Sequence, residues 1–159
     1  MSDCHMPKTN GIDAKPLFRL TADVAPPQVI EGPLGKRLFV PVTRGTFSGD
    51  RLSGIVQAGG SDFQLVRQDG VAELDVRVTL LTDDGVTVQL KGHGIRYTTP
   101  EVFARIMSGA DVDPSEYYFR EALLFEAPVG KYEWLNRIIA IAKGGRLKSQ
   151  VLIDAFEVL

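Results

Sequence analysis

The chain has 159 residues, of which 44% are hydrophobic and 24% charged, and its formal net charge at pH 7 is −2. This length and composition fit one globular domain, and the charge gives no electrostatic reason to bind nucleic acid or an anionic membrane. The single cysteine, Cys4, excludes an intrachain disulfide and favours a reducing compartment. The chain has neither a signal-peptide pattern nor an apolar run of about 18 residues. We therefore expect a soluble, cytoplasmic protein without nucleic-acid or membrane partners.

The N-terminal stretch of residues 1–14 is polar, has no periodicity and contains Pro7 and Gly11. It is predicted to be a flexible tail. Residues 15–159 are predicted to form a single domain.

From Pro16 onward, short segments of alternating apolar and polar residues are separated by turn signals. Pro41 indicates an edge or a bulge, and Gly45 indicates a bend as at a barrel corner. Gly59-Gly60-Ser61 is predicted to be a tight hairpin turn, and residues 144–148 the turn of a final hairpin. Strands are predicted over residues 17–24, 36–47, 52–58, 62–67, 73–80, 86–96, 117–126, 138–142 and 151–158.

One short helix is predicted, over about residues 100–107. Thr98 and Glu101 have the spacing of a capping box, Pro100 suits the first turn, and Gly109 suits the C-terminal stop. Many of the turns between strands are too short for crossover helices, which indicates antiparallel pairing. The predicted fold is all-β, an antiparallel β-barrel of about 8–10 strands with one short helix. It is preferred to a sandwich because the segments keep their alternation and the glycines fall where strands must bend.

The segment from residue 73 to 80 alternates strictly between charged and aliphatic side chains. Its polar face carries Asp75 and Arg77, and its apolar face carries leucine and valine. In most strands such a polar face points to water, whereas in a closed barrel with a polar cavity it could line the cavity. The two interpretations give opposite functions, and the sequence leaves both open.

The segment from residue 117 to 126 has the same ambiguity. Tyr118, Arg120 and Glu126 share one face, while the better core face is aromatic and aliphatic and includes Glu121. If the polar faces of both segments point inward, the cavity contains a catalytic set for acid–base work. The predicted set is Asp75, Arg77, Tyr118, Arg120 and Glu126. The alternative is that these residues form solvent-facing ion pairs.

A second group is predicted to bind a ligand: Asp62, His93, Arg96, Trp134 and Asn136. The glycines on both sides of His93 leave room for a ligand or another backbone. Three of these residues also have a structural alternative: turn capping for Asp62, a strand position beside a bulge for His93, and core packing for Trp134. With His5 as the only other histidine, no histidine-rich metal site is expected.

The sequence also resembles the domain-of-unknown-function-3237 family, from about Pro33 to the C-terminus. The resemblance is carried by residues 59–70, 73–80, 82–85, 94–96, 113–120, 125–126 and 132–136. It implies a small antiparallel barrel, akin to those of allene oxide cyclases and dirigent proteins, which act on small hydrophobic molecules held in the barrel. The chain differs from the family pattern at Gly92, Glu121, Leu123 and Ala127. The family has no established general function.

Two functions are compatible with these observations. One is a cofactor-independent isomerase, cyclase or lyase that uses acid–base residues in the lumen. The other is a non-catalytic barrel that binds an apolar or aromatic metabolite. A third option is an oligomeric structural module, joined through exposed strand edges. No phosphate-binding loop, dinucleotide fingerprint or nucleophile motif is present, so no cofactor is expected. The expected partners are a small molecule and, as an option, further copies of the chain.

Overall fold

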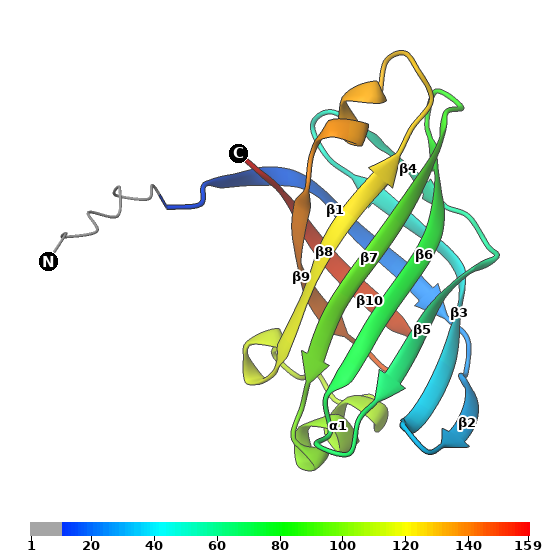
Figure 1. The fold of residues 1–159 in the computed structure, drawn as a ribbon, viewed down its shortest axis with the longest axis vertical. Helices are drawn as coiled ribbons and strands as arrows, with labels where there is room; N and C mark the ends of the chain where they lie inside the picture. Colours follow the sequence, from blue (N-terminus) through cyan, green and yellow to red (C-terminus); the bar gives the residue numbers. More distant parts are fainter. Residues whose placement is uncertain (1–10) are drawn as a thin grey trace, which may run out of the picture.

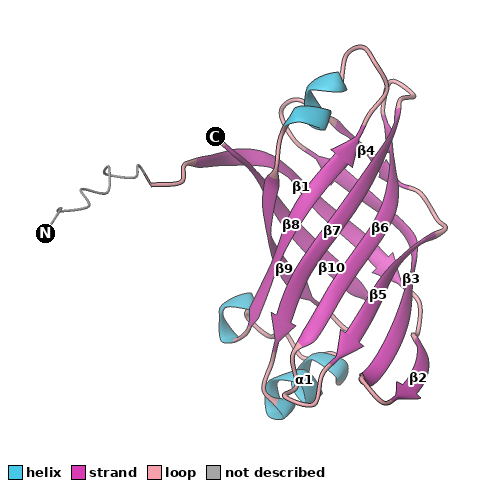
Figure 2. Cartoon of the chain, in the orientation of Figure 1, coloured by secondary structure: helices cyan, strands magenta, loops and turns pink. Residues whose placement is uncertain are grey.

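The computed structural model describes residues 11–159, which form one antiparallel sheet closed into a barrel (Figure 1). Figure 2 shows that helical segments lie only at the two ends of the barrel. The strands are β1 (Ala14–Val24), β2 (Gln28–Gly32), β3 (Gly35–Ser48), β4 (Ser53–Val56), β5 (Gly60–Val66), β6 (Ala72–Thr82), β7 (Thr87–Tyr97), β8 (Tyr118–Glu126), β9 (Ala140–Arg146) and β10 (Gln150–Val158). The helical segments are α1 (Pro100–Met107) and the 3-10 turns η1 (Pro114–Glu116) and η2 (Glu133–Arg137).

Eight strand positions run around the barrel: β1, β10, β9, β8, β7, β6, β4 together with β5, and β3. The sheet closes because β3 also pairs with β1, from Arg19 opposite Ser48 to Val24 opposite Val42. A closed sheet leaves no unpaired edge around most of the wall. The predicted antiparallel barrel of about 8–10 strands with one short α-helix is confirmed.

The sequence predicted a tight hairpin turn at Gly59-Gly60-Ser61, and this prediction is wrong. Strands β4 and β5 do not pair with each other, and both lie between β3 and β6. They form one strand position interrupted by a bulge, because the three residues between Val56 and Gly60 oppose the two residues between Val42 and Gly45 of β3. Gly59 has a φ of +105°, which only glycine adopts readily. A glycine pair suits a bulge as well as a hairpin, so composition could not separate them.

Two further differences concern the ends of strands. Strand β2 was not predicted; all five of its residues are exposed, and it pairs only with the lower part of β3 in Figure 1. The last hairpin turns at residues 147–149, because Gly144 and Gly145 still belong to β9. Of the predicted tail, residues 1–10 and Cys4 lie outside the described residues, and Ala14 already pairs with Val158.

Helix α1 has the predicted bounds but a different N-cap. The Thr99 side chain, rather than Thr98, accepts a hydrogen bond from the backbone N–H of Val102. Gly109, with a φ of +86°, lies just beyond the C-terminal end, as expected for a helix stop. The helix lies at the lower end of the barrel in Figure 1 and buries Ile106 there.

The two ends of the barrel interior differ in their packing. Near η2, which buries Leu135, the rings of Phe47 and Phe125 contact that of Phe18 edge-on, with centroids 5.8 and 6.1 Å away. Towards α1, the next inward-facing residue after Phe18 on β1 is Leu20, and the one next to Phe125 on β8 is Leu123. The interior is therefore solid near η2, and space remains in the half nearer α1.

Candidate functional site

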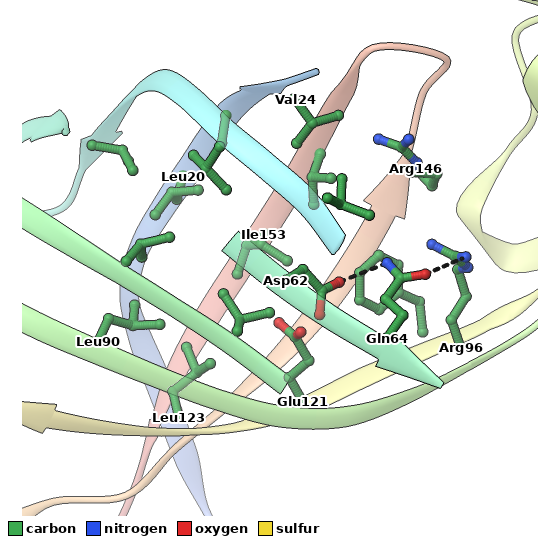
Figure 3. A pocket seen from close by; sticks show the side chains of 18 residues that line it. Leu20, Val24, Asp62, Gln64, Leu90, Arg96, Glu121, Leu123, Arg146 and Ile153 are labelled. Carbon is green, nitrogen blue, oxygen red and sulfur yellow. Dashed lines mark hydrogen bonds between the residues drawn. The ribbon is translucent and has the colours of Figure 1, made fainter. Parts of the chain in front are cut away.

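A cavity occupies this second half of the barrel (Figure 3). Of its eighteen lining residues, all but five are apolar, and the polar ones are Asp62, Gln64, Arg96, Glu121 and Arg146. We call these five residues the inner cluster. The space open to the centre of a water molecule is about 60 Å³, roughly five times what one water needs. The cavity therefore fits a compact molecule.

Asp62 lies on β5, two residues after the bulge. Bulges re-aim the side chains that follow them, and here the carboxyl points into the barrel. One oxygen accepts a hydrogen bond of 2.7 Å from Gln64 Nε2, and the other accepts one of 3.1 Å from the backbone N–H of Asp75. Burial raises the pKa of Asp62, and the two hydrogen bonds and the charge of Arg96 oppose this rise. Donors on both oxygens favour the ionised form, so we assign Asp62 as the carboxylate of the site.

Arg96, near the end of β7, extends the same chain of polar groups. Its guanidinium donates a long hydrogen bond of 3.4 Å to Gln64 Oε1 and lies 5.8 Å from the ring centre of Phe103 on α1. Only 7% of the residue is exposed. Burial lowers the pKa of Arg96, while Asp62 opposes that change. An arginine remains charged even so, so the cavity contains a buried cation.

Glu121 is the second acid of the cavity. It lies on β8, is 5% exposed, and its carboxyl faces that of Asp62 in Figure 3. Burial, reinforced by the charge of Asp62 and opposed by Arg96, raises the pKa of Glu121 to about 8. Glu121 is therefore protonated at neutral pH. Two neighbouring carboxyls in different protonation states are the arrangement from which acid–base pairs are made.

The glycines around His93 make room for Glu121. A Cβ at Gly94 would lie 2.6 Å from Glu121 Cγ and 2.1 Å from the carbonyl oxygen of Arg120. A Cβ at Gly92 would lie 3.1 Å from Leu123 Cδ2. The predicted close approach is thus real, but the group that uses the space is a side chain of β8 inside the barrel.

Arg146, the last residue of β9, completes the inner cluster at the end of the cavity nearer α1. Burial lowers the pKa of Arg146 to about 10, and the charge of Arg96 adds to this. Its backbone N–H donates a hydrogen bond of 2.7 Å to the hydroxyl of Tyr117, and its guanidinium donates a longer one of 3.4 Å to the carbonyl oxygen of Gln150. Two arginines therefore lie at one end of an otherwise apolar cavity.

The predicted catalytic set lies on the outside of the barrel, because the apolar faces of β6 and β8 form the core. Asp75 and Arg77 are 39% and 50% exposed at their side chains, and Arg77 Nε lies 3.6 Å from Asp75 Oδ1. On β8, Tyr118 and Glu126 are exposed and Arg120 is half-buried on the same outer side. The lumenal position on which their predicted role depended is wrong. Asp75 still serves the cavity, through its backbone N–H to Asp62.

The predicted ligand-binding set is divided. Asp62 and Arg96 line the cavity, as the prediction required. His93 points outward, with Nε2 3.8 Å from Asp75 Oδ1. Trp134 and Asn136 lie in η2 at the other end of the barrel. The guanidinium of Arg51 stacks 4.0 Å from the Trp134 ring centre, and the Asn136 amide bonds both backbone groups of Ala127.

The sequence-based prediction missed three residues of the inner cluster: Gln64, Glu121 and Arg146. Glu121 had a readable signal, because it is the only charged residue on the apolar face of residues 117–125. Gln64 shares a face with Asp62, and Arg146 lies where a turn was expected. No comparable signal marked these two.

Within residues 11–159, no group of three or more His, Cys, Asp or Glu side chains is placed to hold a metal ion. None of the helices there has the length and apolar character needed to cross a membrane.

The fold and the cavity define the class: a closed antiparallel β-barrel with an inner cavity lined by aliphatic side chains and a few buried charges. The chain belongs to the family described as protein of unknown function (DUF3237), which matches residues 12–158. It is 35% identical over 144 residues to a UPF0311 protein of Clostridium acetobutylicum, covering 89% of this chain and 91% of that protein. The family resemblance inferred from the sequence is confirmed.

Solved structures share the barrel. A β-barrel-like protein of Acinetobacter baumannii is 35% identical, with a TM-score of 0.83 over 97% of this chain and 100% of that one. A protein of Penicillium herquei, described as an enzyme, has a TM-score of 0.73 over 97% of this chain and 99% of that one. It is only 16% identical, so this likeness concerns the fold alone.

Proposed function

We propose that the protein binds a compact, largely apolar molecule in its barrel and transfers protons on it, as an isomerase, cyclase or lyase that needs no cofactor. The observation that carries the proposal is the pair of facing carboxyls, Asp62 and Glu121, in an apolar cavity. Burial raises the pKa of both acids, but hydrogen-bond donors on both oxygens of Asp62 favour its ionised form, whereas Glu121 is held protonated. Environments that separate the pKa values of two acids assign them the roles of base and acid.

The chemistry balances without another reactant. Asp62 removes a proton from a carbon or oxygen atom of the ligand, and Glu121 donates its proton to a different atom of the same ligand. The ligand is then rearranged with unchanged composition. A proton passing from Asp62 to Glu121, which faces it, restores both groups. If Glu121 protonates a leaving group instead, the same pair gives an elimination. Arg96 stabilises negative charge that develops between these steps.

The alternative is binding without catalysis. It is favoured by the lining, since all but five of the eighteen residues around the cavity are apolar. The fold does not decide between the two, although the Penicillium herquei protein with a similar barrel is called an enzyme.

The test is incubation of the protein in D₂O with a small-molecule extract of its source cells, followed by mass spectrometry. The matched control is the Asp62→Asn, Glu121→Gln double variant, which keeps the shape of both side chains. A compound that gains deuterium or is rearranged only with the wild type supports catalysis. If the wild type leaves every compound in the extract unchanged, the proposed catalysis is overturned. If both proteins bind the same compound and leave it unaltered, the binding alternative is supported.

A further inference from the structure

Arg96 and Arg146 are cations without anions. Within residues 11–159, neither guanidinium has a carboxylate oxygen within 4.0 Å. Their side-chain hydrogen bonds are two long ones of 3.4 Å, to Gln64 and to the Gln150 carbonyl. A guanidinium has five N–H donors, so most of those on Arg96 have no protein acceptor in this part of the chain. Buried charges in proteins are ordinarily paired, which makes this end of the cavity incomplete.

The charges of the inner cluster point to the missing group. At neutral pH Glu121 is neutral because its pKa is about 8, Asp62 carries one negative charge and the two arginines carry two positive charges. One positive charge is therefore uncompensated inside an apolar wall. A ligand with a single negative charge neutralises it, whereas a neutral ligand does not. Planar carboxylates and enolates match the fork of an arginine particularly well.

The rest of the cavity restricts the body of such a ligand. Apart from the inner cluster and Phe119, the lining consists of aliphatic side chains such as Leu20, Leu90 and Ile153. Figure 3 shows the two arginines at one side of the cavity and the leucines at the other. The space open to the centre of a water molecule is small, about 60 Å³. A single ring or a short chain fits it better than a fused ring system.

We propose that the cavity binds a compact organic monoanion, with its carboxylate or enolate oxygens on Arg96 and Arg146 and its apolar body among the leucines and valines. The inference rests on the proposed use of the cavity for a ligand, but not on catalysis. It orients that ligand, because the anionic end lies at the arginines and the neighbouring atoms lie near Asp62 and Glu121.

The test compares acids with amides of the same shape. Benzoate and hexanoate are titrated calorimetrically at pH 7 beside benzamide and hexanamide. At least one acid is expected to bind about tenfold or more tightly than its amide, the effect of a charge-assisted hydrogen bond. If neither acid binds more tightly than its amide, the proposal is overturned.

Variants locate the binding. Arg146→Gln removes a half-buried charge, and a loss of about tenfold or more in acid affinity is expected. Arg96→Gln is expected to lower the acid affinity by a similar factor, and a thermal melting curve shows whether this variant folds. Arg120→Gln removes an arginine from the outer face of β8 and is the matched control. Equal losses in Arg120→Gln and Arg146→Gln would show that the acid binds an outer surface, against the proposal.

Two further measurements complete the test. Acid affinity and turnover are measured separately on the wild type. If the acids bind and no compound is turned over, the anion site stands and the catalytic pair fails, whereas turnover without a preference for acids overturns the anion site alone. Inorganic phosphate is the last probe. If phosphate binds Arg96 and Arg146 as tightly as the organic acids do, the site holds inorganic anions only, and the proposed substrate class is wrong.

Discussion

The wall of the barrel has two groups of charged side chains on its opposite faces. The inner cluster contains Asp62, Glu121 and Arg96, and the outer cluster, as we define it, contains Asp75, Arg77 and His93. Both combine acids with bases, and a single layer of sheet separates them, since Asp62 bonds to the backbone of Asp75. The outer charges lie 3.6 and 3.8 Å apart with 39–63% of each side chain exposed. Of the inner acids, Glu121 is buried and Asp62 is half-buried.

The difference shows that solvent, more than residue type, decides what a charged group does. Exposed ion pairs are screened and contribute roughly 0–1 kcal/mol. In the cavity the same groups lose hydration, and burial shifts the pKa of Glu121 up and the pKa of Arg96 down. Reactive protonation states are expected where hydration is lost.

The largest expected effect is on turnover. Asp62→Asn and Glu121→Gln should each lower kcat/KM by about 10²-fold or more, because each removes one half of a proton transfer. Asp75→Asn should change it less than about twofold, because the backbone N–H that holds Asp62 remains. The rates are measured with the compound that the D₂O experiment identifies. A large loss in Asp75→Asn combined with an active Asp62→Asn would place the chemistry on the outer face.

The next effect is on the pH dependence of stability. The pKa of Glu121 is about 8 when folded, against about 4.3 in a free chain. Below the lower value both states are protonated, and above the higher value both are ionised. Between them the unfolded chain releases the proton that the folded protein keeps, so the stability of the folded state falls as pH rises. The change is at most about 1.4 kcal/mol per pH unit.

Glu121→Gln has no titratable carboxyl group at this position, so it is the matched reference. The stability of the wild type relative to this variant should fall between about pH 4.5 and 8 and then level off. Urea unfolding at several pH values measures it. A constant difference across that range would show that Glu121 has an ordinary pKa.

A smaller effect contrasts two acids on one strand. The shifts in the pKa of Glu121 come from burial and nearby charges, with no hydrogen bond contributing. Glu121→Met replaces it with an apolar chain of similar length and should stabilise the protein by about 1–3 kcal/mol, the usual cost of burying an unbonded polar group. Glu126→Met, on the outer face, should change stability by less than about 0.5 kcal/mol. Thermal melts of both variants compare them, and a destabilised Glu121→Met would mean that the carboxyl has a structural role.

Much of the fold could be read from the sequence because a strand places alternate residues on opposite faces. The alternation of residues 73–80 and 117–126 gave both faces of β6 and β8, and the apolar side proved to be the core. Turn glycines were less informative. The same Gly-Gly pair serves a hairpin or a bulge, and the choice depends on pairing with β3 and β6, which no local pattern contains.

The candidate site was predicted only in part. Alternation shows which face of a strand is apolar, but it does not show that a polar residue on that face points into a cavity. Asp62 and Arg96 were found, although with several outer residues. Polar side chains were sought on polar faces, whereas Arg96 and Glu121 are single charged residues on otherwise apolar faces of β7 and β8. Glu121 is the clearest example, since its burial, reinforced by the charge of Asp62, is what raises its pKa.

The smallest expected effect concerns the outer cluster. Asp75→Asn removes the carboxylate shared by the 3.6 Å pair with Arg77 and the 3.8 Å pair with His93, and Arg77→Gln removes one charge of the first pair only. Each should lower stability by less than about 1 kcal/mol, and the loss should shrink in high salt. Urea unfolding of the two single variants and the double variant gives the coupling between them. A coupling well above 1 kcal/mol that persists in salt would mean that these charges are not screened, and the contrast between the two faces would fail.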